Sequence, residues 1–200
     1  MGDLINMIKK KRRSFGFNGH EYKYFLNKYN KTWRNERCVE IPIIKKFIAN
    51  PFERILEVGN VTKHYYKNNH FVIDKYEKGP GVINADILDF DPYDRYDKII
   101  AISTLEHVGE DVGKPELAIE AIEHLKTLIA PSGEMIITIP AGFNKPLEEK
   151  LFDLGMEIYG MLSINDLWAP CRAEDLKGIE YDFNNHTAIG LYICIFKKRP

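Results

Sequence analysis

Short apolar runs separated by polar turns extend along the chain from about residue 54 onward. Runs of this kind are typical of buried strands, and they alternate here with stretches whose apolar side chains recur at helical spacing. We expect strands at residues 54–58, 71–74, 82–84, 97–102, 134–139, 156–164 and 189–196. We expect helices at residues 35–49, 115–129 and 146–154.

Proline and glycine set limits on two of these helices. Pro42 lies inside the first helical pattern, so that helix should begin at Pro42 or bend there. Pro115 suits the first position of the second helix, and the segment 130–133 should end it with a proline and a glycine. The resulting alternation of strands and helices predicts an α/β fold with a parallel sheet and right-handed crossovers.

A length of 200 residues suits a single domain, residues 1–200. We divide it into an N-terminal segment, residues 1–50, and a core, residues 51–200. Residues 15–34 are dense in aromatic side chains, and packing in the core accounts for most of these rings. The basic run 9–13 is expected to be a mobile, solvated chain end, although it could also touch an anionic membrane surface or a nucleic acid.

The amino-acid composition of the chain limits the kinds of partner that it is expected to bind. The 28 Lys and Arg residues nearly balance 29 Asp and Glu residues, so no global field would attract nucleic acid. No apolar stretch is long enough to span a bilayer. Cys38, Cys171 and Cys194 lie far apart and show no metal-ligand spacing, so we expect no metal site and a reducing, cytoplasmic compartment. The sequence does not indicate an oligomeric state.

Two successive predicted strands end in a carboxylate. Glu57 lies at the end of the first, two positions before Gly59, and Asp74 ends the second, fifteen positions after Gly59. In an open α/β sheet a ligand binds beyond the carboxyl ends of the strands, and a glycine there lets the backbone approach it. An acid about 20 residues past such a turn accepts ribose hydroxyls. Glu57 would repel a pyrophosphate but would suit the ammonium and sulfonium of S-adenosylmethionine.

The segment from residue 53 to residue 140 resembles the class I S-adenosylmethionine-dependent methyltransferases, with five motifs in family order. One departure is that Val61 and Lys63 stand where the later glycines of the first motif would fall. The matching segments are Glu57-Val58-Gly59, Val72-Ile73-Asp74, Asn84-Ala85-Asp86-Ile87, residues 96–108 and residues 133–140.

The resemblance implies a three-layer α-β-α Rossmann-like fold. Its sheet would have seven strands in the order 3-2-1-4-5-7-6, mostly parallel, with an antiparallel last strand. The N-terminal segment would cap the cofactor, and its Arg37 could pair with the cofactor carboxylate, although an ion pair of Arg37 with Glu40 explains that residue nearly as well. The S-adenosylmethionine site implied by the motifs consists of Glu57, Gly59, Asn60, Val61, Asp74, Lys75, Asp86, Ile87, Ser103, Thr104 and Glu106.

Two histidines are candidate catalytic bases. His107 follows the fourth strand of the predicted sheet, close to where the transferred methyl group should point, and is equally compatible with shaping the cofactor site. His64 follows the glycine turn and would lie near the methionine end of the cofactor. His186, before the last strand, could reach the same site, although a loop histidine without a role explains it more simply.

The leading interpretation is a methyltransferase that O-methylates a small hydroxylated acceptor, such as a sugar of a surface glycan or its precursor. The choice of a sugar rests on analogy with the family. Two alternatives stay open: a nicotinamide-dependent oxidoreductase or epimerase, and a non-catalytic module that binds S-adenosylmethionine.

Overall fold

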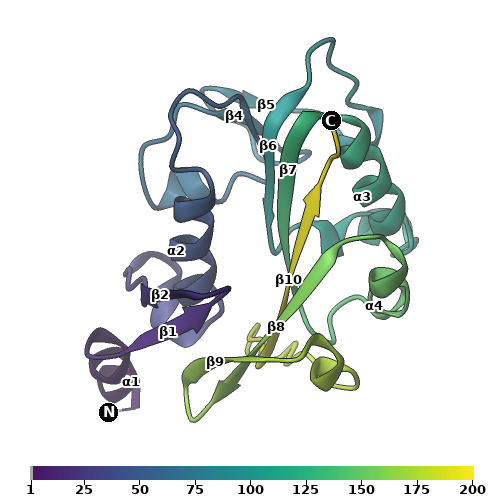
Figure 1. Cartoon of the computed structure of the whole chain (residues 1–200). Coiled ribbons are helices and arrows are strands. Elements are labelled where there is room, and N and C mark those ends of the chain that lie inside the picture. Colours follow the sequence, from purple (N-terminus) through teal and green to yellow (C-terminus); the bar gives the residue numbers. More distant parts are fainter. Residues whose placement is uncertain (1) are drawn as a thin grey trace.

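The computed structural model describes residues 2–200, which form one eight-stranded sheet with helices on both faces (Figure 1). The expected α/β class, with a mostly parallel Rossmann-like sheet, is confirmed. The strands of the sheet are β3 (Ile55–Val58), β4 (Phe71–Ile73), β5 (Val82–Ile83), β6 (Tyr96–Ile102), β7 (Ile129–Pro140), β8 (Glu157–Ile164), β9 (Leu167–Cys171) and β10 (Gly190–Lys197).

The order of strands across the sheet is β5-β4-β3-β6-β7-β10-β8-β9. Counting only the strands that the sequence predicts, this order reads 3-2-1-4-5-7-6. The last strand, β10, lies antiparallel between β7 and β8.

The expected count of seven strands was wrong, because β9 adds an eighth at the edge of the sheet. Asn165 and Asp166 both have positive φ, 50° and 67°, and they link the antiparallel partners Ile164 and Leu167. A two-residue turn with positive φ at both positions makes a tight β-hairpin, which Asn and Asp favour. This Asn-Asp pair was the signal in the sequence for β9.

Side chains along the sheet alternate between two cores, because successive residues of a strand point to opposite faces. In β6, Ile100 and Ile102 pack in the core that contains α2 (Arg37–Phe47). Their neighbours Ile99 and Ala101 pack in the core that contains α3 (Leu117–Thr127) and α4 (Lys145–Lys150). The molecule therefore has three layers, with α2 on one face and α3 and α4 on the other (Figure 1).

Helix α2 begins at Arg37 and continues through Pro42, so Pro42 neither starts the helix nor ends it. A proline inside a helix has no N–H for the carbonyl four residues earlier. That carbonyl, of Cys38, accepts instead from the backbone N–H of Phe25, at 2.9 Å. The preceding segment thus replaces the hydrogen bond that Pro42 cannot make.

The other two helices also differ from expectation at their ends. Helix α3 stops at Thr127, and residues 130–133 belong to the long strand β7 rather than to a terminating turn. The pairing of β6 with β7 shifts register between Tyr96 and Lys98, and Ser132 has a positive φ of 63°. This irregularity lets the Pro-Ser-Gly sequence stay within a strand. Helix α4 is shorter than expected and gives way at Leu151 to a 3₁₀ turn.

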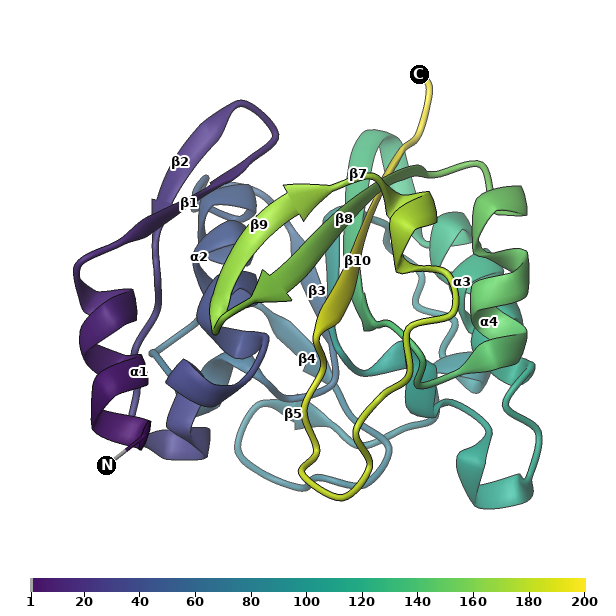
Figure 2. The same ribbon diagram turned by 90° about the horizontal axis from the view of Figure 1, so that it is seen from below.

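The N-terminal segment forms helix α1 (Gly2–Lys11) and a hairpin of β1 (Ser14–Phe17) with β2 (His20–Lys23), beside α2 (Figure 2). Met1 lies outside the described residues. Four of the five residues of the basic run are exposed, as expected, but Lys10 is only 2% exposed and donates from Nζ to the carbonyl oxygen of Trp33 at 2.7 Å. Burial lowers the pKa of Lys10. Among residues 2–200, no helix is long and apolar enough to cross a membrane.

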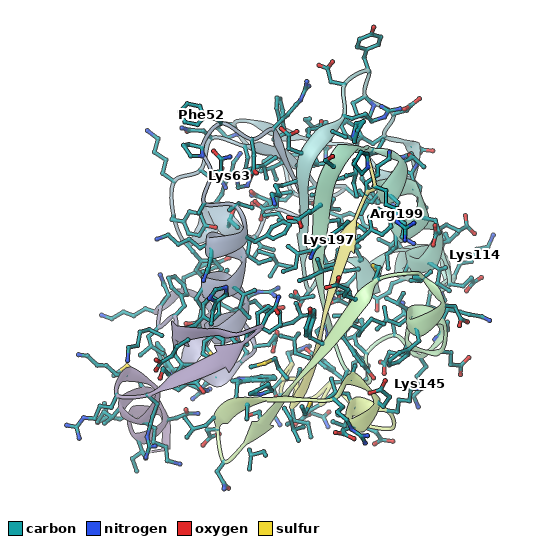
Figure 3. All side chains as sticks on the ribbon, viewed as in Figure 1. Phe52, Lys63, Lys114, Lys145, Lys197 and Arg199 are labelled. Carbon is teal, nitrogen blue, oxygen red and sulfur yellow. The ribbon has the colours of Figure 1, made fainter. Side chains whose placement is uncertain are left out.

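Short 3₁₀ turns connect many of these elements, and Lys63 fixes one of them. It lies in the turn after β3 (Figure 3). Its Nζ donates to the carbonyl oxygens of Pro80 and Gly81, at 3.0 and 2.9 Å. The turns are η1 (Tyr29–Arg34), η2 (Thr62–His64), η3 (Ile87–Asp89), η4 (Leu105–His107), η5 (Glu110–Val112), η6 (Leu151–Asp153) and η7 (Ala173–Leu176).

Candidate functional site

A cavity of about 580 Å³ opens at the carboxyl ends of β3, β4 and β6. The sheet order reverses between β3 and β6, which is where open α/β sheets bind ligands. Of the residues expected at a cofactor site, all line this cavity except Glu57 and Glu106. Those that line it are Arg37, Gly59, Asn60, Val61, Asp74, Lys75, Asp86, Ile87, Ser103 and Thr104. His64 and His107 line it as well.

Gly59 makes the sharp turn at the end of β3. Its φ is +83°, and a Cβ placed on it would lie 2.5 Å from Oγ1 of Thr104. Its N–H donates to the carbonyl oxygen of Ile73 at 2.8 Å, which ties the end of β3 to the end of β4. Only glycine fits both the backbone conformation and the space.

Glu57 does not reach the cavity, contrary to the sequence-based expectation. Its buried carboxylate accepts from the backbone N–H groups of Val61 and Thr62, at 3.0 and 2.7 Å. Its other oxygen contacts Thr62 Oγ1 and lies 2.6 Å from Nε2 of His70. A buried carboxylate needs such partners, and the turn after β3 supplies them. Glu57 therefore holds the loop that forms the cavity wall.

Asp74 lines the cavity and also organises the loop after β4. Its Oδ2 accepts from the N–H of Asn60 at 2.9 Å, and its Oδ1 accepts from the N–H groups of Tyr76 and Glu77 at 2.9 and 2.7 Å. The side chain of Asn60 donates from Nδ2 to Glu77 Oε1 at 2.5 Å. The buried Oδ1 of Asn60 has no hydrogen-bond partner among the described residues, so it is an acceptor available to a ligand.

The far wall of the cavity carries a network of three charged groups. Nζ of Lys75 lies 3.0 Å from Asp86 and 2.6 Å from Asp111. Hydrogen bonds to these two carboxylates raise the pKa of Lys75. Asp86 also caps η3 by accepting from the N–H of Leu88 at 3.0 Å. The positive charge of Lys75 is thus balanced by two carboxylates of the same wall, so other residues determine the net charge of the cavity.

Arg37 faces the cavity from α2, within a buried polar network. Its Nη1 donates to Glu40 at 2.5 Å, so the ion pair considered from the sequence exists, although it is buried rather than on the surface. Glu40 also accepts from the hydroxyls of Ser103 and Thr138, both at 2.6 Å. Burial opposes the charge of Arg37, but Glu40 and Glu36 outweigh it and raise the pKa of the guanidinium.

His64 stacks on Tyr29, with ring centroids 4.9 Å apart, and its Nε2 lies 3.2 Å from Glu77. Tyr29 comes from the N-terminal segment, so this stack joins that segment to the turn after β3. The sequence pattern did not single out Glu77 as a site residue. Glu77 lies three positions after Asp74, and this closeness to a predicted strand end was the available signal.

His107 lies where the main cavity meets a second one of about 190 Å³, and it lines both. Its side chain is 50% exposed, its Nδ1 lies 2.7 Å from Glu110, and its ring packs edge-on against Phe143. Glu106 was expected at the cofactor and instead lines the second cavity, because η4 turns its side chain to the buried side. His186 also reaches the second cavity.

Glu36 and Glu106 are both buried in the wall of the second cavity. Burial raises the pKa of Glu106 well above its usual range, and the nearby charges of Glu40 and Glu36 add to this rise. Burial, followed by the charge of Glu40, raises the pKa of Glu36 to about 7. Local sequence pattern could not reveal this cavity, since its walls come from α2, η4 and two loops that only the fold brings together.

The raised pKa of Glu36 predicts a measurable pH dependence of stability. Between pH 4.5 and about 7 the folded chain retains a proton on Glu36 that the unfolded chain has lost, so stability falls as the pH rises. Between pH 5 and pH 7.5, the free energy of unfolding of the wild type should fall by about 2 kcal/mol more than that of Glu36→Gln. Urea unfolding of both proteins at the two pH values measures this difference, and a constant difference would contradict the assignment.

The sequence matches no protein-family model and no curated protein. Among solved structures, it is similar to the N-methyltransferase NodS from Bradyrhizobium japonicum WM9 in complex with S-adenosyl-L-homocysteine, at 14% identity over 74% of this chain and 79% of that chain, with a TM-score of 0.46. It is also similar to a possible histamine N-methyltransferase from Thermotoga maritima, at 15% identity over 77% of this chain and 86% of that chain, with a TM-score of 0.48. Similarity at this level concerns the fold alone, so the function of this chain has to be inferred from its own side chains.

Proposed function

We propose that this chain is a methyltransferase that uses S-adenosylmethionine. The observation that carries the proposal is the charge of the main cavity. Asp74, Glu77 and Glu110 add acid to its wall, while the two strongest cations, Lys75 and Arg37, are already paired with Asp86, Asp111 and Glu40. An acidic wall suits a sulfonium and an ammonium, and it opposes the pyrophosphate of a nicotinamide dinucleotide.

Named residues would hold each part of this cofactor. Asp74 and Glu77 would accept from the ribose hydroxyls, as the position of an acid after the second strand suggests. The free Oδ1 of Asn60 would accept from the cofactor ammonium. Arg37 would pair with the cofactor carboxylate, and Asp86 with Ile87 would flank the adenine. S-adenosylmethionine supplies an activated methyl group, so the protein contributes mainly by positioning the acceptor in line with it.

The N-terminal segment, residues 1–50, would act as a cap over this cofactor within a single domain. Tyr29, Asn30 and Arg37 of the segment line the main cavity, which supports this role. The core, residues 51–200, would supply the strand ends that hold the cofactor.

The acceptor would enter the second cavity, which adjoins the first at His107 and is large enough only for a small molecule or one sugar ring. We propose that a hydroxyl is methylated, and a sugar is the candidate acceptor. The mixture of rings and amides in the wall supports a sugar, because its CH faces pack on Phe143 and Tyr181 while its hydroxyls reach Asn30 and Asn35. His107 would take the proton of the hydroxyl as the new O–CH₃ bond forms and the S–CH₃ bond of the sulfonium breaks, with S-adenosylhomocysteine as the leaving group.

Replacing His107 with alanine should lower the rate of methyl transfer by about a hundredfold. The affinity for S-adenosylhomocysteine should change little, because the other groups of the cavity wall remain. The control is His20→Ala in the exposed hairpin, which should leave both quantities unchanged. A His107→Ala protein that loses cofactor binding would show that His107 shapes the cofactor site, and His64 would then be the candidate base.

The proposed activity is tested by incubating the protein with S-adenosylmethionine labelled in its methyl group and a panel of sugars and sugar phosphates. Labelled methyl in a product, with one S-adenosylhomocysteine formed per transfer, supports the proposal. Hydride transfer from a reduced nicotinamide cofactor to a member of the same panel would instead support the oxidoreductase. Binding of S-adenosylhomocysteine without turnover on any acceptor would favour a non-catalytic module.

A further inference from the structure

The second cavity is lined by two buried carboxyl groups, each of which has one oxygen without a partner. Glu36 is 7% exposed and Glu106 is 1% exposed. Oε2 of each has no hydrogen-bond partner among the described residues. Buried polar atoms are nearly always paired, so two such oxygens in the wall of one cavity indicate a ligand that donates to both.

The cations near this cavity do not satisfy these two carboxyl groups. The guanidinium of Arg37 is committed to Glu40, which lies behind the cavity wall. Nδ1 of His107 is directed to Glu110, and its Nε2 lies 3.9 Å from Oε1 of Glu106 rather than at hydrogen-bond distance. Without a cationic ligand, burial raises the pKa of both carboxyl groups and favours their neutral forms, whereas a bound cation would stabilise their ionised forms. With Glu36 and Glu106 ionised, the cavity carries more negative than positive charge, and a cationic ligand would complete it.

Aromatic rings form another part of the same wall. Phe143 lies between His107, with ring centroids 4.5 Å apart, and Tyr181, with centroids 5.0 Å apart. Phe183 packs against both Phe143 and Tyr181, at 5.3 and 5.0 Å, which fixes the orientation of the rings. Ring faces beside carboxylates are a favourable environment for an ammonium group, since the π system and the acids attract the same charge.

We propose that the second cavity binds a protonated amino group of the methyl acceptor through the carboxylates of Glu36 and Glu106. This inference rests on the proposed function and narrows its acceptor to a hydroxylated molecule that carries an amine, such as an amino sugar. Glu36 and Glu106 are binding residues in this arrangement, and the hydroxyl to be methylated lies toward His107 and the main cavity.

The test uses the full chain saturated with S-adenosylhomocysteine and two matched pairs of probes. Glucosamine is compared with glucose, and 2-aminoethanol with ethylene glycol, by NMR titration at pH 7.5. We expect at least one amine to bind at least about tenfold more tightly than its matched alcohol. Equal binding within both pairs, by a protein that does bind S-adenosylhomocysteine, would overturn this inference and leave the proposed function intact. Failure to bind S-adenosylhomocysteine would instead count against the proposed function.

Two variants of equal shape assign the effect to the carboxylates. Glu36→Gln and Glu106→Gln should each remove most of the preference for the amine. Their affinity for S-adenosylhomocysteine should not change, because neither residue lines the main cavity. The control Glu123→Gln, on the exposed side of α3, should retain the preference. An unchanged preference in both glutamine variants would overturn the proposal.

A pH titration of the wild type gives a second measurement that needs no variant. The preference for 2-aminoethanol over ethylene glycol should weaken as the pH falls from 8 to 5, because the carboxyl groups gain protons and no longer attract the ammonium, which stays protonated over this range. Among the described residues, the charged and titratable groups near Glu36 and Glu106 include Arg37, Cys38, Glu40, His107, Tyr181 and His186. A preference that stays constant over this range would contradict the proposal.

Discussion

Replacing Gly59 with alanine is expected to weaken the binding of S-adenosylhomocysteine by about a thousandfold, which corresponds to about 4 kcal/mol. Two costs add at this position. The φ of +83° is strained for a residue with a Cβ, and the new Cβ would lie 2.5 Å from Thr104 Oγ1, where one of the two must move. Because both residues line the main cavity, the adjustment deforms the surface that would contact the cofactor.

The matched control is Gly19→Ala in the turn of the β1-β2 hairpin. Gly19 has a similar φ of +74°, but a Cβ there would meet nothing within 4 Å. Gly19→Ala therefore carries the backbone strain without the collision, and its affinity for S-adenosylhomocysteine should equal that of the wild type. Calorimetric titration of the two variants measures the contrast. Tight binding by folded Gly59→Ala would show that the cofactor does not approach this turn.

Replacing Glu57 with alanine is expected to lower the free energy of unfolding by about 3–5 kcal/mol. The change removes the acceptor for two backbone N–H groups, those of Val61 and Thr62. It also leaves the buried Thr62 hydroxyl and His70 without this partner. Donors left unpaired in the interior cost far more than the loss of an exposed ion pair, for which Glu123→Ala is the control at about 1 kcal/mol or less.

Urea unfolding of Glu57→Ala and Glu123→Ala measures the two changes in the free energy of unfolding. If Glu57→Ala keeps nearly wild-type stability but loses its affinity for S-adenosylhomocysteine, then Glu57 contacts the cofactor directly, as the sequence first suggested. If Glu57→Ala is less stable and its affinity for S-adenosylhomocysteine falls by no more than the loss of stability explains, then Glu57 acts by holding the loop after β3.

The strands and the place of the main cavity could be predicted because both depend on local pattern. Each core strand is a short apolar run, and Gly59, Asp74 and Ser103 follow such runs directly, so their convergence follows from the geometry of a parallel sheet. Glu57 was placed wrongly because its orientation depends on donors from Thr62 and His70, which the strand pattern does not contain.

The second cavity could not be predicted from the sequence, for a different reason. Its acids, Glu36 and Glu106, are 70 residues apart, and its rings come from loops on either side of β8 and β9. No periodicity links these positions, and only the packing of α2 against the sheet brings them together. The buried state of Lys10 was missed in the same way, since its partner is a backbone carbonyl of η1 rather than an acidic side chain.

The central claim, that the main cavity binds S-adenosylmethionine rather than a dinucleotide, is tested most directly by calorimetric titration of the wild-type chain with S-adenosylhomocysteine and, separately, with NAD⁺. We predict saturable binding of S-adenosylhomocysteine with a dissociation constant on the order of micromolar, about −8 kcal/mol, and no heat of binding for NAD⁺. Saturable binding of NAD⁺ without binding of S-adenosylhomocysteine would contradict the account.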